Sequence, residues 1–178
     1  MGYNAGASSG NLILIQKQVA SNSASLTFTT GITGYEVLFL EFYGVLNVDN
    51  NQNLYMQVST DGGSTYLSTN YISQGAFSYS GGLVQNPASA NLAAFMLSQS
   101  PENSSTTPAC GSAKLFNFKD SAFNKYCFSN YVSYYGATPV ASFVGTSLES
   151  TAVVNAVRII AQSGNISVGT FKLYGVQN

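Results

Sequence analysis

Short runs of β-branched and aromatic residues recur along this chain between clusters of Gly, Ser, Asn and Asp, and apolar residues at helical spacing are nearly absent. Branched and aromatic side chains pack well on a pleated sheet, whereas the residues between the runs favour turns. The pattern predicts an all-β fold, a sandwich or a barrel, with about nine or ten strands. The candidate strands are residues 12–19, 25–30, 36–43, 54–60, 66–68, 92–97, 113–118, 125–135, 140–144, 156–161 and 169–174.

Alternation within these runs indicates which side chains share a face of the sheet. In residues 54–59, Leu54, Met56 and Val58 point one way and polar or amphipathic residues the other, which predicts one buried and one exposed face. Residues 12–15 are apolar on both faces, so we expect that strand to be central or covered. Residues 91–97 fit a short helix as well as a strand, and both alternatives stay open.

Two stretches rich in Gly, Ser, Asn and Pro, residues 75–91 and 98–108, are expected to be long loops that carry contacts. The length of 178 residues fits one domain of ordinary size, and no internal repeat or linker divides it. We therefore expect a single domain spanning residues 1–178, with residues 1–10 as an N-terminal arm.

Charge is scarce, with six basic and seven acidic residues and no histidine. Without an imidazole, Ser-His-Asp triads and most catalytic zinc sites are excluded, and so few cations cannot neutralise several phosphates. No apolar run approaches the roughly 18 residues of a membrane-spanning helix, and the N-terminus lacks the pattern of a secretory signal peptide. We expect synthesis in the cytoplasm and no nucleic-acid partner, membrane insertion, cofactor or metal.

The acidic residues leave little room for glycoside hydrolysis, which needs two facing carboxylates. Glu36 and Glu41 lie on opposite faces of one expected strand. The other five fall in turns or loops: Asp49, Asp61, Glu102, Asp120 and Glu149. The Asn-rich segment 47–53 offers oxygen ligands for calcium but holds a single carboxylate, so a solvated turn is the preferred interpretation.

Residues 59–66 resemble a single Asp-box, Ser-x-Asp-x-Gly-x-Thr followed by an aromatic residue. Asp61 is suited to accept backbone N–H bonds across the turn, and Gly62 and Gly63 to adopt positive φ angles. Thr65 and Tyr66 are expected to restart a strand. Because Asp-boxes are structural and repeat once per blade in propellers, a single copy predicts a turn and no catalytic site.

The two cysteines, Cys110 and Cys127, could form a disulfide, bind a metal or lie buried as free thiols. If residues 113–118 and 125–135 pair as a hairpin around residues 120–122, Cys127 lies opposite Leu115. Cys110 is then five residues out of register, beyond the reach of a disulfide. Two buried free thiols are the favoured outcome.

Tyrosine is unusually frequent, with 12 copies. Its ring and hydroxyl suit either the packing of a core or subunit interface, or stacking on sugar rings, and the sequence supports both readings equally. The candidates for a recognition surface are the loop-adjacent Tyr66, Tyr71, Tyr79, Tyr134 and Tyr135.

Four segments together carry a resemblance to a known group: residues 12–21, LILIQKQVAS; 58–66, VSTDGGSTY; 154–166, VNAVRIIAQSGNI; and 169–176, GTFKLYGV. Over roughly residues 11–176 the chain resembles small β-sandwich proteins and domains of tailed bacteriophages, found in tail fibres or on capsid surfaces. The resemblance implies an antiparallel, jelly-roll-like virion component assembled around a symmetry axis, and it brings no catalytic residues. Cys110, Cys127 and the loop of residues 98–108 depart from that group.

The functional expectation is a non-enzymatic virion protein that decorates a capsid or forms part of a tail fibre. Its expected partners are copies of itself, as a homo-oligomer with a trimer favoured, and other virion proteins. The alternative is a module that binds a host-surface glycan, with loop tyrosines stacking on sugars. A glycan hydrolase is the remote third hypothesis.

Overall fold

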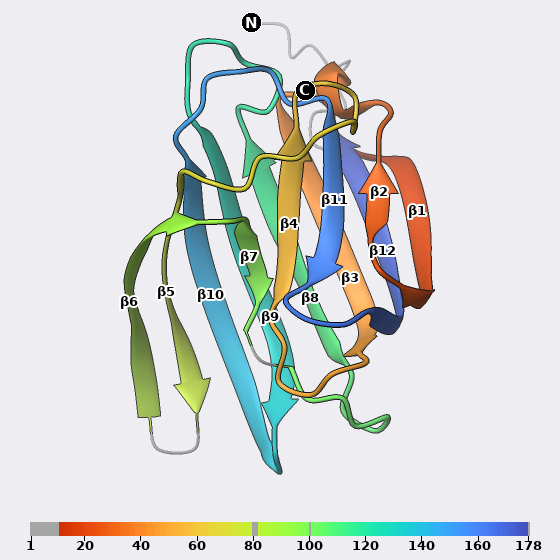
Figure 1. The fold of residues 1–178 in the computed structure, drawn as a ribbon, viewed down its shortest axis with the longest axis vertical. Helices are drawn as coiled ribbons and strands as arrows, with labels where there is room; N and C mark the ends of the chain where they lie inside the picture. The colour runs from red at the N-terminus through yellow and green to blue at the C-terminus, as the bar shows by residue number, and fades with distance from the viewer. Residues whose placement is uncertain (1–10, 80–81, 100, 178) are drawn as a thin grey trace, which may run out of the picture.

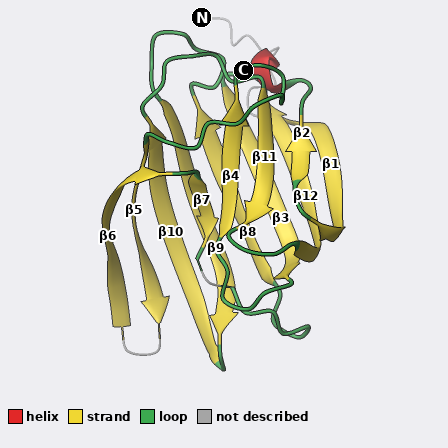
Figure 2. Cartoon of the chain, in the orientation of Figure 1, coloured by secondary structure: helices red, strands yellow, loops and turns green. Residues whose placement is uncertain are grey.

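The computed structural model describes residues 11–79, 82–99 and 101–177, which form twelve strands and one short 3-10 helix in two antiparallel sheets (Figures 1 and 2). The predicted all-β sandwich is confirmed. The larger sheet has eight strands in the order β1 (Leu12–Ser23), β12 (Ile166–Val176), β3 (Val37–Asn47), β8 (Ala109–Phe116), β9 (Lys125–Tyr135), β10 (Thr138–Leu148), β5 (Tyr71–Tyr79) and β6 (Gly82–Leu92). The smaller sheet has the order β2 (Leu26–Phe28), β11 (Ala156–Ala161), β4 (Leu54–Ser59) and β7 (Phe95–Ser98), and the helix η1 spans Ile32–Gly34.

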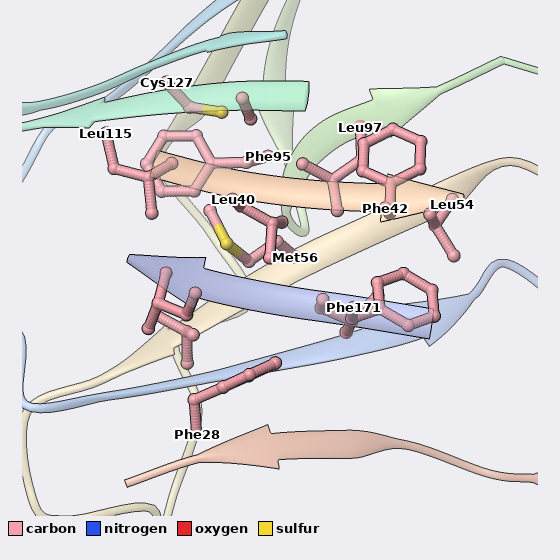
Figure 3. Packing of buried hydrophobic residues seen from close by; sticks show 14 of the residues in the cluster. Phe28, Leu40, Phe42, Leu54, Met56, Phe95, Leu97, Leu115, Cys127 and Phe171 are labelled. Carbon is pink, nitrogen blue, oxygen red and sulfur yellow. The ribbon is translucent and has the colours of Figure 1, made fainter. Parts of the chain in front are cut away.

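The core lies between the two sheets, and alternation along the strands fills it. Leu54, Met56 and Val58 of β4 are fully buried, as their spacing predicts. Figure 3 shows Met56 packed among aromatic and aliphatic side chains from both sheets, including Phe42 and Phe171, whose rings stack with centroids 6.1 Å apart. Burying each such side chain contributes about 1.5–3 kcal/mol, so this layer is the main source of stability.

The opposite face of β4 differs from the prediction of an exposed surface. Gln57 is buried because the guanidinium of Arg158, on neighbouring β11, donates two hydrogen bonds of 2.8 and 2.6 Å to its Oε1. Gln57 Nε2 in turn donates to the carbonyl of Ala93 at 2.9 Å. A cross-strand partner therefore covers a position that alternation alone assigns to solvent.

The first strand is neither central nor covered, which corrects the prediction from its two apolar faces. β1 is an edge strand of the larger sheet, hydrogen-bonded to β12. Leu12, Ile13 and Leu14 are exposed, while Ile15 packs against the core. Apolar residues on both faces indicate a strand with two usable surfaces, but they do not specify which neighbours cover those surfaces.

The middle of the chain holds the other errors in the strand assignments. Of residues 75–91, expected as a loop, the described residues 75–79 and 82–91 belong to the antiparallel pair β5 and β6, and residues 66–68, expected as a strand, are irregular. At Gly75 a Cβ would collide with the backbone of β10, so close strand packing explains a glycine that resembles a loop signal. Residues 91–97 form no helix: they contain the end of β6 and most of β7. The described part of the expected loop 98–108 has no strand between Gln99 and Pro108.

A buried lysine joins the hairpin of β8 and β9 to the loop before β11. Lys125 is fully buried, and its Nζ donates to the backbone carbonyls of Asp120, Phe123 and Thr151 at 2.5, 2.8 and 3.2 Å. Three acceptors surround the ammonium as a solvation shell would, which offsets part of the cost of burying a cation.

Candidate functional site

The face of the eight-stranded sheet that points away from the smaller sheet is exposed and apolar along β9 and β10. Exposed residues on β9 alternate with buried ones, so that Tyr126, Phe128 and Val132 point outward. Phe128 and Val132 are each 48% exposed and Phe143 on β10 is 49% exposed. Large apolar side chains gathered on neighbouring strands form a patch of the kind that marks interaction sites.

Charge is absent from the centre of this face. The chain contains no charged residue from Tyr126 to Leu148, which covers all of β10 and all but the first residue of β9. On β3 and β12, Glu41 accepts bonds from Lys172 and from the Tyr174 hydroxyl at 3.4 and 3.2 Å. The exposed cation Lys114 of β8 borders this uncharged stretch, in register with Phe128 on β9.

A shallow hollow of about 350 Å³ lies on this face between β8, β9 and β10. Its outward-pointing residues are small or moderate in size, and Cys110, Val132 and Ala141 form one cross-strand row. In the next row, Ser112 Oγ donates to Asn130 Oδ1 at 2.7 Å. Beside these short side chains stand the larger Phe128 and Phe143, so the same face carries projections and a depression. We call the surface formed by Phe128, Phe143 and the hollow between the three strands the outer patch.

The Asp-box-like segment forms the predicted turn. Asp61 accepts hydrogen bonds from Ser59 Oγ at 2.6 Å, from the Thr65 N–H at 2.9 Å and from Thr65 Oγ1 at 2.7 Å. The φ angles of Gly62 and Gly63 are 76° and 93°, as the turn requires. The hydrogen bond from Ser59, followed by those from Thr65, holds the pKa of Asp61 well below its usual range.

This turn is tied to the loop before β11, and it does not restart a strand. Asn155 accepts a bond from the Gly62 N–H at 2.8 Å and donates to the carbonyl of Thr60 at 3.0 Å. Tyr66 lies under the guanidinium of Arg158, 4.2 Å from the ring centroid. The carboxylate, the amide and the aromatic ring thus all have partners within the chain, and their arrangement is that of a structural turn.

The five candidate tyrosines do not form one recognition surface. Tyr71 is fully buried, which corrects its assignment to the surface: its ring packs edge-on against Phe95 and its hydroxyl donates to the carbonyl of Leu67 at 3.2 Å. The side chain of Tyr79 lies outside the described residues. Tyr134 is half-buried and Tyr135 exposed.

The remaining tyrosines lie at opposite ends of the sandwich. Tyr66 lies beside the loop before β11, at the same end of the sandwich as Lys125, the first residue of β9, which donates to the carbonyl of Thr151 in that loop. Tyr134 and Tyr135 are the last residues of β9, roughly 30 Å away at about 3.3 Å per residue. Convergent stacking of these rings on one sugar is therefore not supported by their positions.

The cysteines pair with other residues, as the hairpin register predicts. Cys127 lies opposite Leu115 and Cys110 opposite Val132, and both thiols are free. Cys127 is buried, and this burial raises the pKa of its thiol well above its usual range. The expectation that both are buried is wrong for Cys110, which lies exposed in the outer patch.

The described parts of the chain contain no group of three or more His, Cys, Asp or Glu side chains arranged to hold a metal ion. Glu36 forms a 2.6 Å ion pair with Lys119, and Asp49 accepts a bond from Ser163 Oγ at 2.9 Å. Within residues 11–79, 82–99 and 101–177, no helix has the length and apolar character that a membrane span requires.

Sequence reasoning missed the three residues that dominate the outer patch: Phe128, Val132 and Phe143. Two signals could have found them. The strict alternation of residues 125–135 separates Phe128 and Val132 from the core set, and the uncharged stretch from Tyr126 to Leu148 marks a surface unlike an ordinary solvated sheet. What the sequence lacks is any sign that the smaller sheet covers only the other face.

Comparison of this chain with protein-family models, with curated proteins and with solved structures finds no significant match.

Proposed function

We propose that this chain is a non-enzymatic structural protein of a bacteriophage virion, placed on the capsid surface or in a tail fibre, that works through contacts between its sheet surfaces and neighbouring protein chains. The observation that carries the proposal is the outer patch: exposed Phe128, Val132 and Phe143 on adjacent strands with no charge among them. A solvated sheet face ordinarily carries polar residues, because leaving aromatic surface in water forfeits the free energy of its burial.

The chemistry of the described side chains favours contact over catalysis. Asp61 is held in a turn, Glu36 and Glu41 form ion pairs with lysines, and the chain has no histidine. Surfaces rich in serine, asparagine and glycine carry few titratable groups, so their charge changes little with pH. This property suits a particle that persists in varied surroundings. The virion setting itself comes from the resemblance of the four sequence segments, since the comparisons match no family.

Immunogold electron microscopy tests the proposed function. Antibodies raised against the purified chain are applied to particles released from cells that carry the phage genome encoding this chain. We expect gold on the particle surface, on heads or on tails, and loss of labelling when the antibodies are first absorbed with the pure chain. A chain that remains entirely in the supernatant after the particles are sedimented, with unlabelled particles, contradicts the proposal.

A further inference from the structure

We propose that the outer patch packs against the same patch of a second copy of this chain, related by a twofold axis that crosses the strands near Asn130. The inference rests on the proposed function and specifies its partner. The size, the charge and the shape of this face support a second copy as the partner.

The face is large enough for a stable interface. Residues 71–92 and 126–148 contain no charged residue, and β8 contains one, Lys114. These regions form five neighbouring strands, β8, β9, β10, β5 and β6, which at about 4.8 Å between strands and about 10 residues of about 3.3 Å each span roughly 790 Å² in plan. A standard interface buries about 800 Å² on each partner. The outer patch with its surrounding strands therefore supplies the required area without the smaller sheet.

The charge distribution favours an identical partner. Burying a charge without an opposite charge is costly, so a surface without charges is best matched by another uncharged apolar surface. From Tyr126 to Leu148 no charge needs to be paired, and Glu41 and Lys172, on strands beyond β8, pair with each other. A second copy presents the same nearly uncharged surface, whereas a nucleic acid or an acidic partner brings many phosphates or carboxylates to a single cation, Lys114, which lies opposite Phe128.

The shape is self-complementary about Asn130. Phe128 and Val132 lie two residues to either side of Asn130 on β9, each displaced by about 6.6 Å. A twofold axis across the strands at Asn130 exchanges these positions, so Phe128 of each copy lies over the hollow beside Val132 of the other. Phe143 is in register with Asn130 and therefore lies near the axis, where it meets its own symmetry mate.

The same axis predicts one specific contact between unlike residues. On β8, Ser112 is in register with Asn130, and Cys110 and Lys114 lie two residues to either side of it. The axis therefore places Cys110 of one copy near Lys114 of the other, and keeps the two Cys110 residues about 13 Å apart along the strand direction.

Light scattering and sedimentation equilibrium test whether the outer patch holds two copies together. We expect the mass of two chains, and a dissociation constant raised about 30-fold or more by Phe128→Glu or Phe143→Glu, since these place a charge in an apolar interface. The matched control is Phe123→Glu, at a residue that is 60% exposed in the β8–β9 turn, which should leave the mass unchanged. A wild-type monomer at the highest soluble concentration overturns the inference, as does a dimer that Phe128→Glu leaves intact.

Cross-linking tests the axis. Mild oxidation of Lys114→Cys should give a covalent dimer through Cys110, while the wild type and Lys119→Cys should not, since Lys119 lies beyond β8. A bridge within one chain is excluded because residues 110 and 114 are about 13 Å apart on one strand. Absence of cross-linked Lys114→Cys, or equal cross-linking of Lys119→Cys, overturns the pairing.

Failure of the pairing is distinguishable from failure of the proposed function. A mass of three chains, the order expected from the sequence, overturns the twofold pairing, and immunogold labelling of particles still decides the virion role. Unlabelled particles with an intact dimer overturn the role and leave the pairing in place.

Discussion

Replacing the buried Lys125 with methionine tests the account of how the β8–β9 hairpin is joined to the rest of the sandwich. Methionine keeps an unbranched, buried side chain of similar length and removes the three donors of the ammonium group. The carbonyls of Asp120, Phe123 and Thr151 then lose bonds of 2.5, 2.8 and 3.2 Å at a site where the lysine side chain is fully buried.

The expected loss follows from counting these acceptors. A hydrogen bond to a charged group contributes about 1.5–3 kcal/mol, so the loss of three such bonds sets a gross cost of about 4.5–9 kcal/mol. Methionine offsets part of this, because the cation no longer has to be desolvated and its own apolar surface is buried. We expect Lys125→Met to lower the free energy of unfolding by about 3 kcal/mol.

Urea denaturation of the wild type and the variant, followed by fluorescence or circular dichroism, measures the change. Lys17→Met is the matched control: Lys17 is exposed on the edge strand β1, so its replacement should change the stability by less than about 0.5 kcal/mol. If Lys125→Met is as stable as this control, the three carbonyl bonds contribute little and the reasoning is refuted.

Three further predictions use groups whose environments differ sharply. With a thiol reagent, Cys110 should react rapidly in the folded Phe128→Glu variant, whose outer patch is uncovered, and Cys127 only after unfolding, and fast reaction of both thiols would contradict the burial of Cys127. Because the pKa of Asp61 is lowered, the stabilisation that its carboxylate provides is complete above its ordinary pKa of about 3.9 and is lost as the pH falls. Asp61→Asn should therefore flatten the fall in urea midpoint from about pH 5 to about pH 2, and an unchanged slope would contradict this. In an alkaline absorbance titration, burial should shift Tyr71 and Tyr131 to a pKa of about 12, so Tyr71→Phe should remove amplitude from the late phase alone.

The local features of this protein were predictable from the sequence because they depend on near neighbours. The positions of most strands follow from the runs of branched and aromatic residues, and residues 125–135 coincide with β9. The register that places Cys127 opposite Leu115 follows from the length of one hairpin. The turn around Asp61 follows from residue types within seven positions of each other.

The errors share a different origin, since each concerns contacts between segments far apart in the chain. Tyr71 looked like a loop residue and is buried against Phe95. Cys110 looked like a small buried hydrophobe and is exposed. Gly75 looked like a loop signal and marks close packing of β5 on β10.

The sequence by itself determined that this chain forms alternating strands and turns with scarcely any titratable chemistry, because a period of two and the choice of residue types are local properties. Only the tertiary structure decided which face of each strand meets the smaller sheet, that β1 lies at an edge, and that Phe128 and Phe143 face outward. Alternation sorts side chains into two sets but assigns neither set to the core. That assignment depends on where the second sheet packs, which the free energy of the whole folded chain determines.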